Sequence, residues 1–171
     1  MLDLVRKIVN SAKKYNLPYK IVLAQAILET GYFKKYKYNN VFGIKATKKD
    51  IDAGKYYEVQ TTEYTNGQKK VINAKFAKFS SIDEAVKRYN EIIKRNFPYA
   101  DKNRHNDMLF LQGLFKGKYK YATDPKYIDK IKKIIKQLDK AIKTNKKPLS
   151  IGAIGIGAVF LYFLTKKYLQ K

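Results

Sequence analysis

The sequence IVLAQAILETGYF at residues 21–33 predicts a helix that is apolar on nearly every side. A helix of this kind is buried, so the rest of the domain must pack around it. We expect it to span residues 19–30, with Asn16 as its N-terminal cap and Pro18 in its first turn. Gly31 follows as a stop signal, because glycine readily adopts the left-handed conformation that ends helices.

The segments on either side of this helix have patterns of their own. Apolar residues recur at helical spacing in several of them, and at a spacing of two around Asn66-Gly67, which is a strong signal for a tight β-hairpin. Ser81 and Glu84 have the spacing of a capping box, which opens a helix. The predicted elements are a helix at residues 1–15, an ordered loop at 39–45, a β-hairpin at 56–79, a helix after Ser81, a short helix at 107–115 and a long helix from Asp124.

Together these elements predict an α+β fold that is mostly helical, with a small β-hairpin lobe, in one domain at residues 1–145. A basic hinge and tail follow at 146–171, where LSIGAIGIGAVFLYFL (149–164) carries no charge and is flanked by lysines. A helix of this length spans about 24 Å, slightly short of a hydrocarbon core of about 30 Å, but flanking lysines can snorkel. We therefore predict a transmembrane helix through residues 149–165. The alternative is a terminal core or oligomerisation helix; the sequence does not indicate an oligomeric state.

The net charge of +23 predicts a polyanionic partner, such as nucleic acid, an anionic membrane surface or a wall rich in carboxylate and phosphate. Only four of the 37 basic residues are arginine, the residue that nucleic-acid-binding proteins favour for bidentate contacts. We therefore expect no nucleic-acid partner. A lysine bias imposed by an AT-rich genome is the other explanation of the charge.

Several kinds of catalytic site are excluded by composition. Cysteine is absent, and the only histidine, His105, lies in a polar run and is predicted to be a surface residue. Thiolate metal sites, histidine clusters, cysteine nucleophiles and Ser/His/Asp triads therefore cannot form. We expect no metal and no other cofactor, which leaves carboxylates, tyrosines and amides for chemistry.

Glu29 is the carboxylate with the clearest reason to be perturbed, because it ends the most apolar helix of the domain. Burial and the negative end of the helix dipole both disfavour its charged form, so both raise its pKa. A carboxyl that stays protonated near neutral pH can donate its proton to a leaving-group oxygen. The alternative is an ordinary glutamate at a helix end, facing solvent.

A second carboxylate is usually needed for glycoside hydrolysis, and the predicted hairpin supplies Glu58 and Glu63. Glu63 is nearer the turn and so is better placed to project from a mobile lobe. If Asn66-Gly67 forms a two-residue turn, Glu63 lies opposite Lys70, and a plain cross-strand ion pair is the competing explanation.

Several sequence blocks, in this order, resemble the glucosaminidase family of bacterial cell-wall hydrolases, glycoside hydrolase family 73. They are IVLAQAILETGYF (21–33), NNVFGIKA (39–46), TTEYTNG (61–67), SSIDEAVKRY (80–89) and YATDPKY (121–127). The resemblance implies a lysozyme-like helical fold with a small β lobe. It also implies hydrolysis of the β-1,4 bond on the reducing side of N-acetylglucosamine in peptidoglycan glycan strands.

The resemblance assigns roles to individual residues. Glu29 corresponds to the general acid, Glu63 to a β-lobe base or stabiliser, and Tyr121 to a tyrosine beside the reacting sugar. Tyr32 stands where the family commonly has tryptophan, and stacking on sugar should survive that change. The implied substrate-binding residues are Tyr32, Asn40, Phe42, Gly43 and Asp124. The resemblance leaves open whether the β-lobe acid or the substrate's own acetamido group activates the attack.

Residues 1–15 do not resemble a secretory signal peptide. Without such a peptide, a C-terminal membrane helix would leave the catalytic domain on the side of the membrane where it is made, away from the wall. One hypothesis is a membrane-containing bacteriophage that carries the protein in its virion and uses it at entry. Alternatives are a tail-anchored lysin released when the membrane is breached and a bacterial enzyme exported by a specialised route. The rival functions are a muramidase or lytic transglycosylase of the same architecture, and a non-catalytic wall-binding virion protein.

Overall fold

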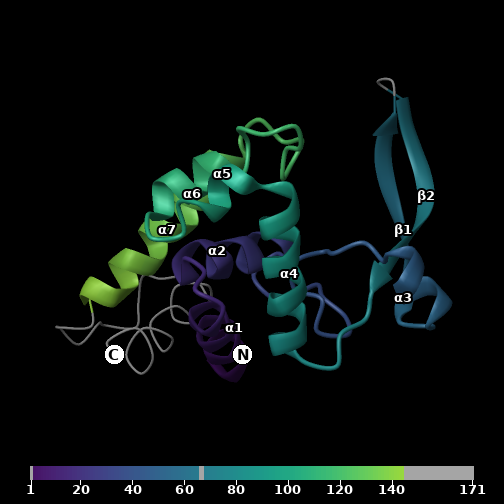
Figure 1. Cartoon of the computed structure of the whole chain (residues 1–171), viewed down its shortest axis with the longest axis horizontal. Helices are drawn as coiled ribbons and strands as arrows, with labels where there is room; N and C mark the ends of the chain where they lie inside the picture. Colours follow the sequence, from purple (N-terminus) through teal and green to yellow (C-terminus); the bar gives the residue numbers. More distant parts are fainter. Residues whose placement is uncertain (1, 66–67, 145–171) are drawn as a thin grey trace, which may run out of the picture.

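The computed structural model describes residues 2–65 and 68–144. Within them the fold is mostly helical with one two-stranded antiparallel sheet, as predicted (Figure 1). His105 is exposed, also as predicted. The elements are α1 (Leu2–Lys14), α2 (Tyr19–Glu29), α3 (Lys48–Asp52), β1 (Tyr56–Thr65), β2 (Gln68–Ala77), α4 (Ile82–Asn96), α5 (Pro98–Asp101), α6 (Asp107–Gly113) and α7 (Tyr127–Thr144).

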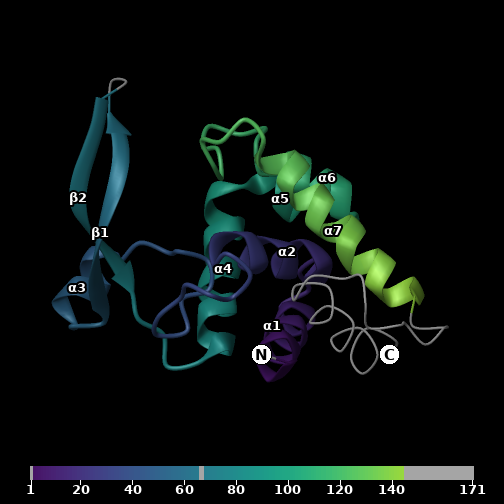
Figure 2. The same ribbon diagram turned by 180° about the vertical axis from the view of Figure 1, so that it is seen from behind.

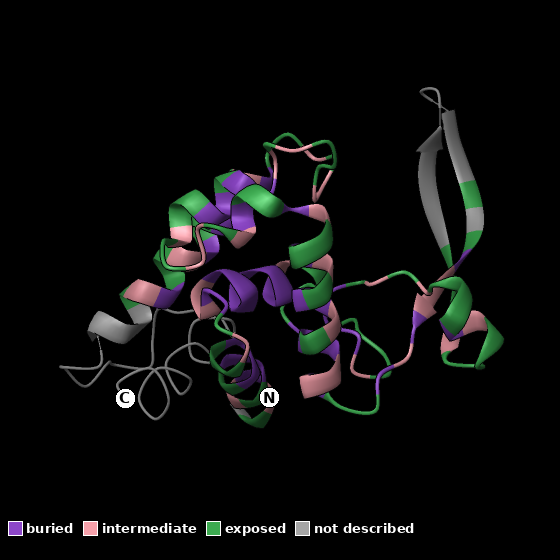
Figure 3. Ribbon diagram, in the orientation of Figure 1, coloured by how far each residue is buried: buried purple, intermediate pink, exposed green. Residues whose placement is uncertain are grey.

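Helix α2 forms the centre of the helical body. All seven residues from Ile21 to Ile27 are buried, and α1, α6 and α7 pack against it, while α4 packs on α1. Figure 3 shows α2 as the most continuously buried element, whereas the surrounding helices bury one face each. The all-round apolar pattern of residues 21–27 therefore reflects contacts on several sides.

Asn16 does not cap α2, contrary to the sequence prediction. Its backbone is left-handed, with φ of 52°, and Pro18 occupies the N-cap position of α2 without a side-chain hydrogen bond. The N–H of Asn16 donates to Lys13 O, and the N–H of Leu17 donates to Ala12 O. These two bonds form a Schellman motif, so Asn16 ends α1 instead of beginning α2.

The β-hairpin has the register expected for a two-residue connection. Thr65 pairs with Gln68, and Glu63 pairs with Lys70. The hairpin projects from the helical body, with α3 at its foot (Figures 1 and 2). It therefore forms a separate small lobe, as the sequence predicts.

An ion pair joins this lobe to the helical body. Arg88 on α4 donates two hydrogen bonds of 3.0 Å to the carboxylate of Asp50 on α3. Asp50 also closes a capping box with Thr47 at the start of α3. Helix α3 is not predicted from the sequence, because five residues carry too little periodicity to identify a helix.

Helix α4 begins as predicted at Ser81, whose side chain accepts a hydrogen bond from Glu84 N at 3.1 Å. The Glu84 carboxylate binds Ser80 N and Ser80 Oγ, one residue before the cap, so the reciprocal bond of a full capping box is displaced. The buried face of α4 contains Ile82, Ala85, Val86, Tyr89 and Ile93.

The predicted transmembrane helix at residues 149–165 lies outside the described part of the chain, as does the proposed boundary at 145–146. Among the residues described, none of the helices has the length and apolar character needed to cross a bilayer.

Candidate active site

Glu29 occupies the last turn of α2, where the helix end is fixed by backbone hydrogen bonds. The N–H of Gly31 donates to Leu28 O, and that of Tyr32 donates to Ile27 O. Gly31 has φ of 55°, so it ends the helix as predicted. This geometry places the Glu29 side chain where α2 leaves the buried core and becomes exposed.

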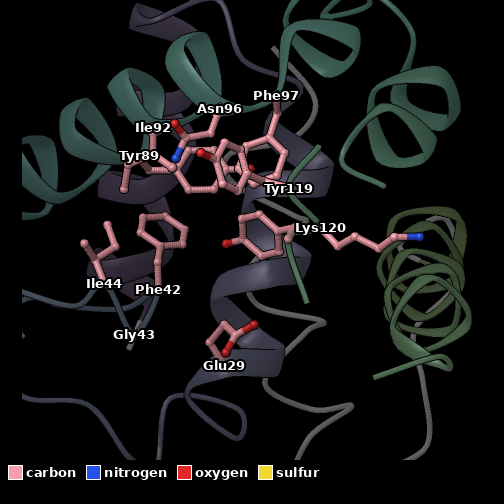
Figure 4. Close-up of a pocket in the computed structure, with 11 residues that line it drawn as sticks. Glu29, Phe42, Gly43, Ile44, Tyr89, Ile92, Asn96, Phe97, Tyr119 and Lys120 are labelled. Atoms are coloured by element: carbon pink, nitrogen blue, oxygen red, sulfur yellow. The ribbon is translucent and has the colours of Figure 1, made fainter. Parts of the chain in front are cut away.

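A pocket with a volume of about 390 Å³ opens beside Glu29 (Figure 4). Its walls come from α2, the loop after it, α4 and the segment before α7, and many of the lining side chains are aromatic. Lys120 extends away from the other labelled side chains. The lining residues are Glu29, Phe42, Gly43, Ile44, Tyr89, Ile92, Asn96, Phe97, Tyr119, Lys120 and Tyr121. A second pocket of about 460 Å³ shares Glu29, Lys120 and Tyr121 with the first.

The Glu29 side chain is exposed to this pocket rather than enclosed in the core. The pocket walls still displace water from around the carboxyl, and this desolvation raises the pKa of Glu29. A hydrogen bond of 3.1 Å from the Tyr127 hydroxyl to Oε1 of Glu29 opposes the shift in part. The net effect raises the pKa of Glu29, so its carboxyl holds a proton to higher pH than an ordinary glutamate does; a general acid requires the protonated form.

Tyr127 is a site residue that sequence reasoning did not single out. Its ring is buried, with 4% of the residue exposed, and its hydroxyl also accepts a hydrogen bond from Gln25 Nε2 at 3.2 Å. The available signal was its position within the block YATDPKY, six residues after Tyr121. The contact with Glu29 spans two distant helices, so periodicity could not indicate it.

Tyr121 lies beside Glu29 in both pockets. Its ring packs against those of Phe97 and Tyr127, with centroids 5.8 Å and 5.6 Å away. Desolvation holds the pKa of its hydroxyl well above the usual value, so the hydroxyl keeps its proton. The structure thus brings Tyr121 and Glu29 together.

The loop at residues 39–45 contributes Phe42 and Gly43 to the pocket. Gly43 has φ of 61°, a conformation that favours glycine. Asn40 is 3% exposed, and its amide binds Ile44 O, Ala77 O and Ile44 N at 2.9, 3.0 and 2.9 Å. These contacts assign Asn40 a role in holding the loop, from which Phe42 and Gly43 reach the pocket.

Asp124 lies at the margin of the site, whereas Tyr32 lines neither of the two pockets. Tyr32 is 39% exposed, and its hydroxyl donates to Gln137 Oε1 at 3.3 Å. Asp124 lines the second pocket together with Glu29. Its carboxylate accepts hydrogen bonds from Lys130 Nζ and Lys126 N, and these lower its pKa. The pKa of Asp124 is therefore lowered, whereas that of Glu29 is raised.

Glu63 is placed by its backbone alone. It lies on β1 opposite Lys70, and its side chain falls outside the described part of the structure. Its role as base or stabiliser therefore stays a prediction. Among the side chains described, no cluster of carboxylates or imidazole has the arrangement of a metal site.

A helical body, a small β lobe and a glutamate of raised pKa in an aromatic pocket are the features expected of a glycoside hydrolase domain of lysozyme-like fold. The chain belongs to the glucosaminidase family. The family model described as mannosyl-glycoprotein endo-β-N-acetylglucosaminidase matches residues 5–140.

Individual relatives agree with this assignment. The chain is 34% identical to the peptidoglycan hydrolase FlgJ of Salmonella typhimurium over 139 residues, covering 75% of this chain and 42% of that protein. It is 32% identical to the exo-glucosaminidase LytG of Bacillus subtilis over 140 residues, covering 74% and 46%. The solved glycoside hydrolase domain of Salmonella typhimurium FlgJ superposes with a TM-score of 0.64 and 33% identity, covering 81% and 97%. The matched segment spans under half the length of the full FlgJ and LytG proteins.

Proposed function

We propose that this domain hydrolyses the β-1,4 glycosidic bond on the reducing side of N-acetylglucosamine in peptidoglycan, with Glu29 as the general acid. The observation that carries the proposal is the raised pKa of Glu29 in a pocket walled by aromatic rings. A protonated carboxyl can protonate the leaving oxygen, and aromatic faces can stack on sugar rings. The names of FlgJ and LytG support the substrate class.

The substrate would lie along the two adjoining pockets, which share Glu29 and Tyr121. In this proposal Tyr121 contacts the sugar at the cleaved bond. Phe42 and Gly43 bind the glycan on one side, and Asp124, ionised and held by Lys130, accepts hydrogen bonds from the substrate on the other. Tyr32, which is exposed but lines neither pocket, is proposed as a further surface on which the glycan stacks.

Glu63 is the proposed second carboxylate, acting as base or stabiliser from the β lobe. Substrate assistance by the acetamido group is the competing way to complete the reaction. A Glu63→Gln variant separates them: a large loss of kcat supports the direct role, whereas near-normal kcat favours the acetamido route.

The bond specificity is tested by mass spectrometry of the muropeptides released from purified peptidoglycan. New reducing ends on N-acetylglucosamine are expected. Reducing muramic ends would identify a muramidase instead, and anhydro-muramic ends a lytic transglycosylase. Binding to peptidoglycan without release of any fragment would identify a non-catalytic wall-binding protein.

We further propose that residues 149–165 anchor the protein in a membrane, on the basis of their uncharged apolar sequence. A membrane-containing phage virion is one setting in which such an anchor and a wall hydrolase act together. Recovery of the full-length protein in the membrane fraction, and its loss from that fraction on deletion of residues 149–165, tests the anchor. Recovery in the soluble fraction alone would contradict it.

A further inference from the structure

A continuous chain of hydrogen bonds leads from the core of the domain to Glu29. Tyr89 on α4 donates to Gln25 Oε1 at 2.6 Å, Gln25 Nε2 donates to the Tyr127 hydroxyl at 3.2 Å, and Tyr127 donates to Glu29 Oε1 at 3.1 Å. Tyr89, Gln25 and Tyr127 are 1%, 0% and 4% exposed. Three buried polar side chains thus form a hydrogen-bonded chain that ends at Glu29, the one carboxyl among the described residues that lines the first pocket.

The direction of these bonds follows from the protons available. The amide of Gln25 accepts only at Oε1 and donates only at Nε2, while each tyrosine hydroxyl has a single proton. If the amide were reversed, Tyr89 would accept from Nε2 and its own buried proton would lose its acceptor, which is costly. With Oε1 toward Tyr89, Nε2 faces Tyr127, and the Tyr127 proton is left for Glu29.

Both tyrosines keep their protons at any pH at which the protein would act, because desolvation raises the pKa of Tyr89 and of Tyr127. Tyr127 accepts the hydrogen bond from Gln25 Nε2 and therefore directs its single proton at Oε1 of Glu29. A protonated Glu29 then has to carry its own proton on Oε2.

We propose that Gln25 and Tyr127 are positioning residues that keep the acid proton of Glu29 on Oε2, available to the leaving-group oxygen, and that Tyr89 fixes the direction of the chain. This inference rests on the proposed function as a glycoside hydrolase. In the acid step the proton moves from Glu29 Oε2 to the glycosidic oxygen as the bond to the sugar breaks. Tyr127 keeps its own proton and stabilises the carboxylate that results.

The first test measures the pKa of Glu29 by carboxyl carbon NMR titration of the full chain. Tyr127→Phe keeps the ring and removes the donor to the carboxylate, so the pKa of Glu29 should rise above that of the wild type. Gln25→Leu should also raise it, because the Tyr127 hydroxyl can then turn and accept the Glu29 proton. The double variant should match Tyr127→Phe alone, since the two residues act in series.

Tyr15→Phe is the matched control. The Tyr15 hydroxyl donates to Asp83 Oδ2 at 3.0 Å, so this variant also removes a bond from a tyrosine to a carboxylate, but one outside the pocket. It should leave the pKa of Glu29 unchanged. Thermal unfolding of every variant identifies any that no longer fold.

The second test separates kcat from KM on purified peptidoglycan. Tyr127→Phe and Gln25→Leu should each lower kcat about tenfold, with KM changed less than about twofold, and shift the basic limb of the pH profile upward. A purely structural role would lower thermal stability without shifting the pH profile.

The two proposals fail separately. A folded wild type that releases no fragment from peptidoglycan overturns the proposed function, whereas the NMR titration needs no activity. An active wild type whose Glu29 pKa is unaltered by Tyr127→Phe overturns the positioning role alone. An equal shift from Gln25→Leu with and without Tyr127 likewise shows that the residues do not act in series.

Discussion

The hydroxyl of Tyr127 lies 3.1 Å from Oε1 of Glu29, although the two residues are 98 positions apart in the chain. The contact joins the first residue of α7 to the last residue of α2. Because Tyr127 is buried, the orientation of the Glu29 carboxyl is tied to the packing of both helices.

Glu29→Gln should lower the rate of peptidoglycan hydrolysis by about 100- to 10,000-fold, because the amide keeps the shape of the carboxyl but cannot donate an acid proton. Turbidity loss of a peptidoglycan suspension measures the effect. Glu91→Gln on the exposed face of α4 is the control and should retain wild-type activity. Equal lysis by Glu29→Gln and wild type would contradict the proposed mechanism.

The pH profile of kcat/KM should lose activity on its basic side as pH rises through the pKa of Glu29. Desolvation raises this pKa, so the loss should occur above the range of an ordinary glutamate. The same shift makes the folded state bind a proton more tightly than the unfolded chain. The stability that Glu29 contributes is therefore complete below the unfolded pKa and is lost as pH rises through the folded pKa. Melting temperatures of wild type and Glu29→Gln across this range check the sign.

Asp50→Asn should destabilise the fold by about 2 kcal/mol at neutral pH, because it breaks a nearly buried ion pair with Arg88. The Arg88 guanidinium holds the pKa of Asp50 well below its usual range. The stability from this pair is therefore present above the unfolded pKa and is lost as pH falls through the folded pKa, so the difference between variant and wild type should shrink in acid. Urea unfolding of the wild type and Asp50→Asn at two pH values measures this difference in stability.

The control for this pair lies on the same helix. Asp52 pairs with Lys48 at 3.0 Å, but both side chains are largely exposed. Asp52→Asn should therefore cost no more than about 0.5 kcal/mol. Equal destabilisation by the two variants would show that the Asp50–Arg88 pair does not hold the lobes together.

Gly113→Ala should destabilise the domain by about 1–3 kcal/mol, because an added Cβ would lie 2.4 Å from Ala100 N where α6 meets α5. Gly117→Ala is the control, since a Cβ there has no heavy atom within 4 Å. Thermal unfolding compares the two. A Gly113→Ala protein as stable as Gly117→Ala would refute the close approach of the two helices.

Asn40→Ala should lower stability by about 2–3 kcal/mol and lower activity with it, because three hydrogen bonds fix the loop that carries Phe42 and Gly43. Asn73→Ala, at an exposed position on β2, should be neutral. Lost activity with unchanged melting temperature would instead assign Asn40 a direct contact with sugar.

Local patterns were sufficient for most of the helical body and for the hairpin. Gly31 ends α2 as predicted, and the pairing of Glu63 with Lys70 agrees with a two-residue connection at Asn66-Gly67. The sequence predicts the wrong helix for Asn16, because asparagine suits both an N-cap and a left-handed helix end. Asn16 lies between two adjacent helices, and local sequence does not show whether it ends the first or begins the second.

A nearly all-round apolar helix that ends at Glu29 can be predicted from local sequence, because side-chain period and end signals are properties of neighbouring residues. The surroundings of that carboxyl depend on the packing of distant helices. Tyr89 and Tyr127 contact Gln25 from 64 and 102 positions away, so these contacts exist only because α4 and α7 pack around α2. The pKa of Glu29 depends on desolvation by the surrounding elements and on the hydrogen bond from Tyr127, so it is a consequence of packing rather than of local sequence.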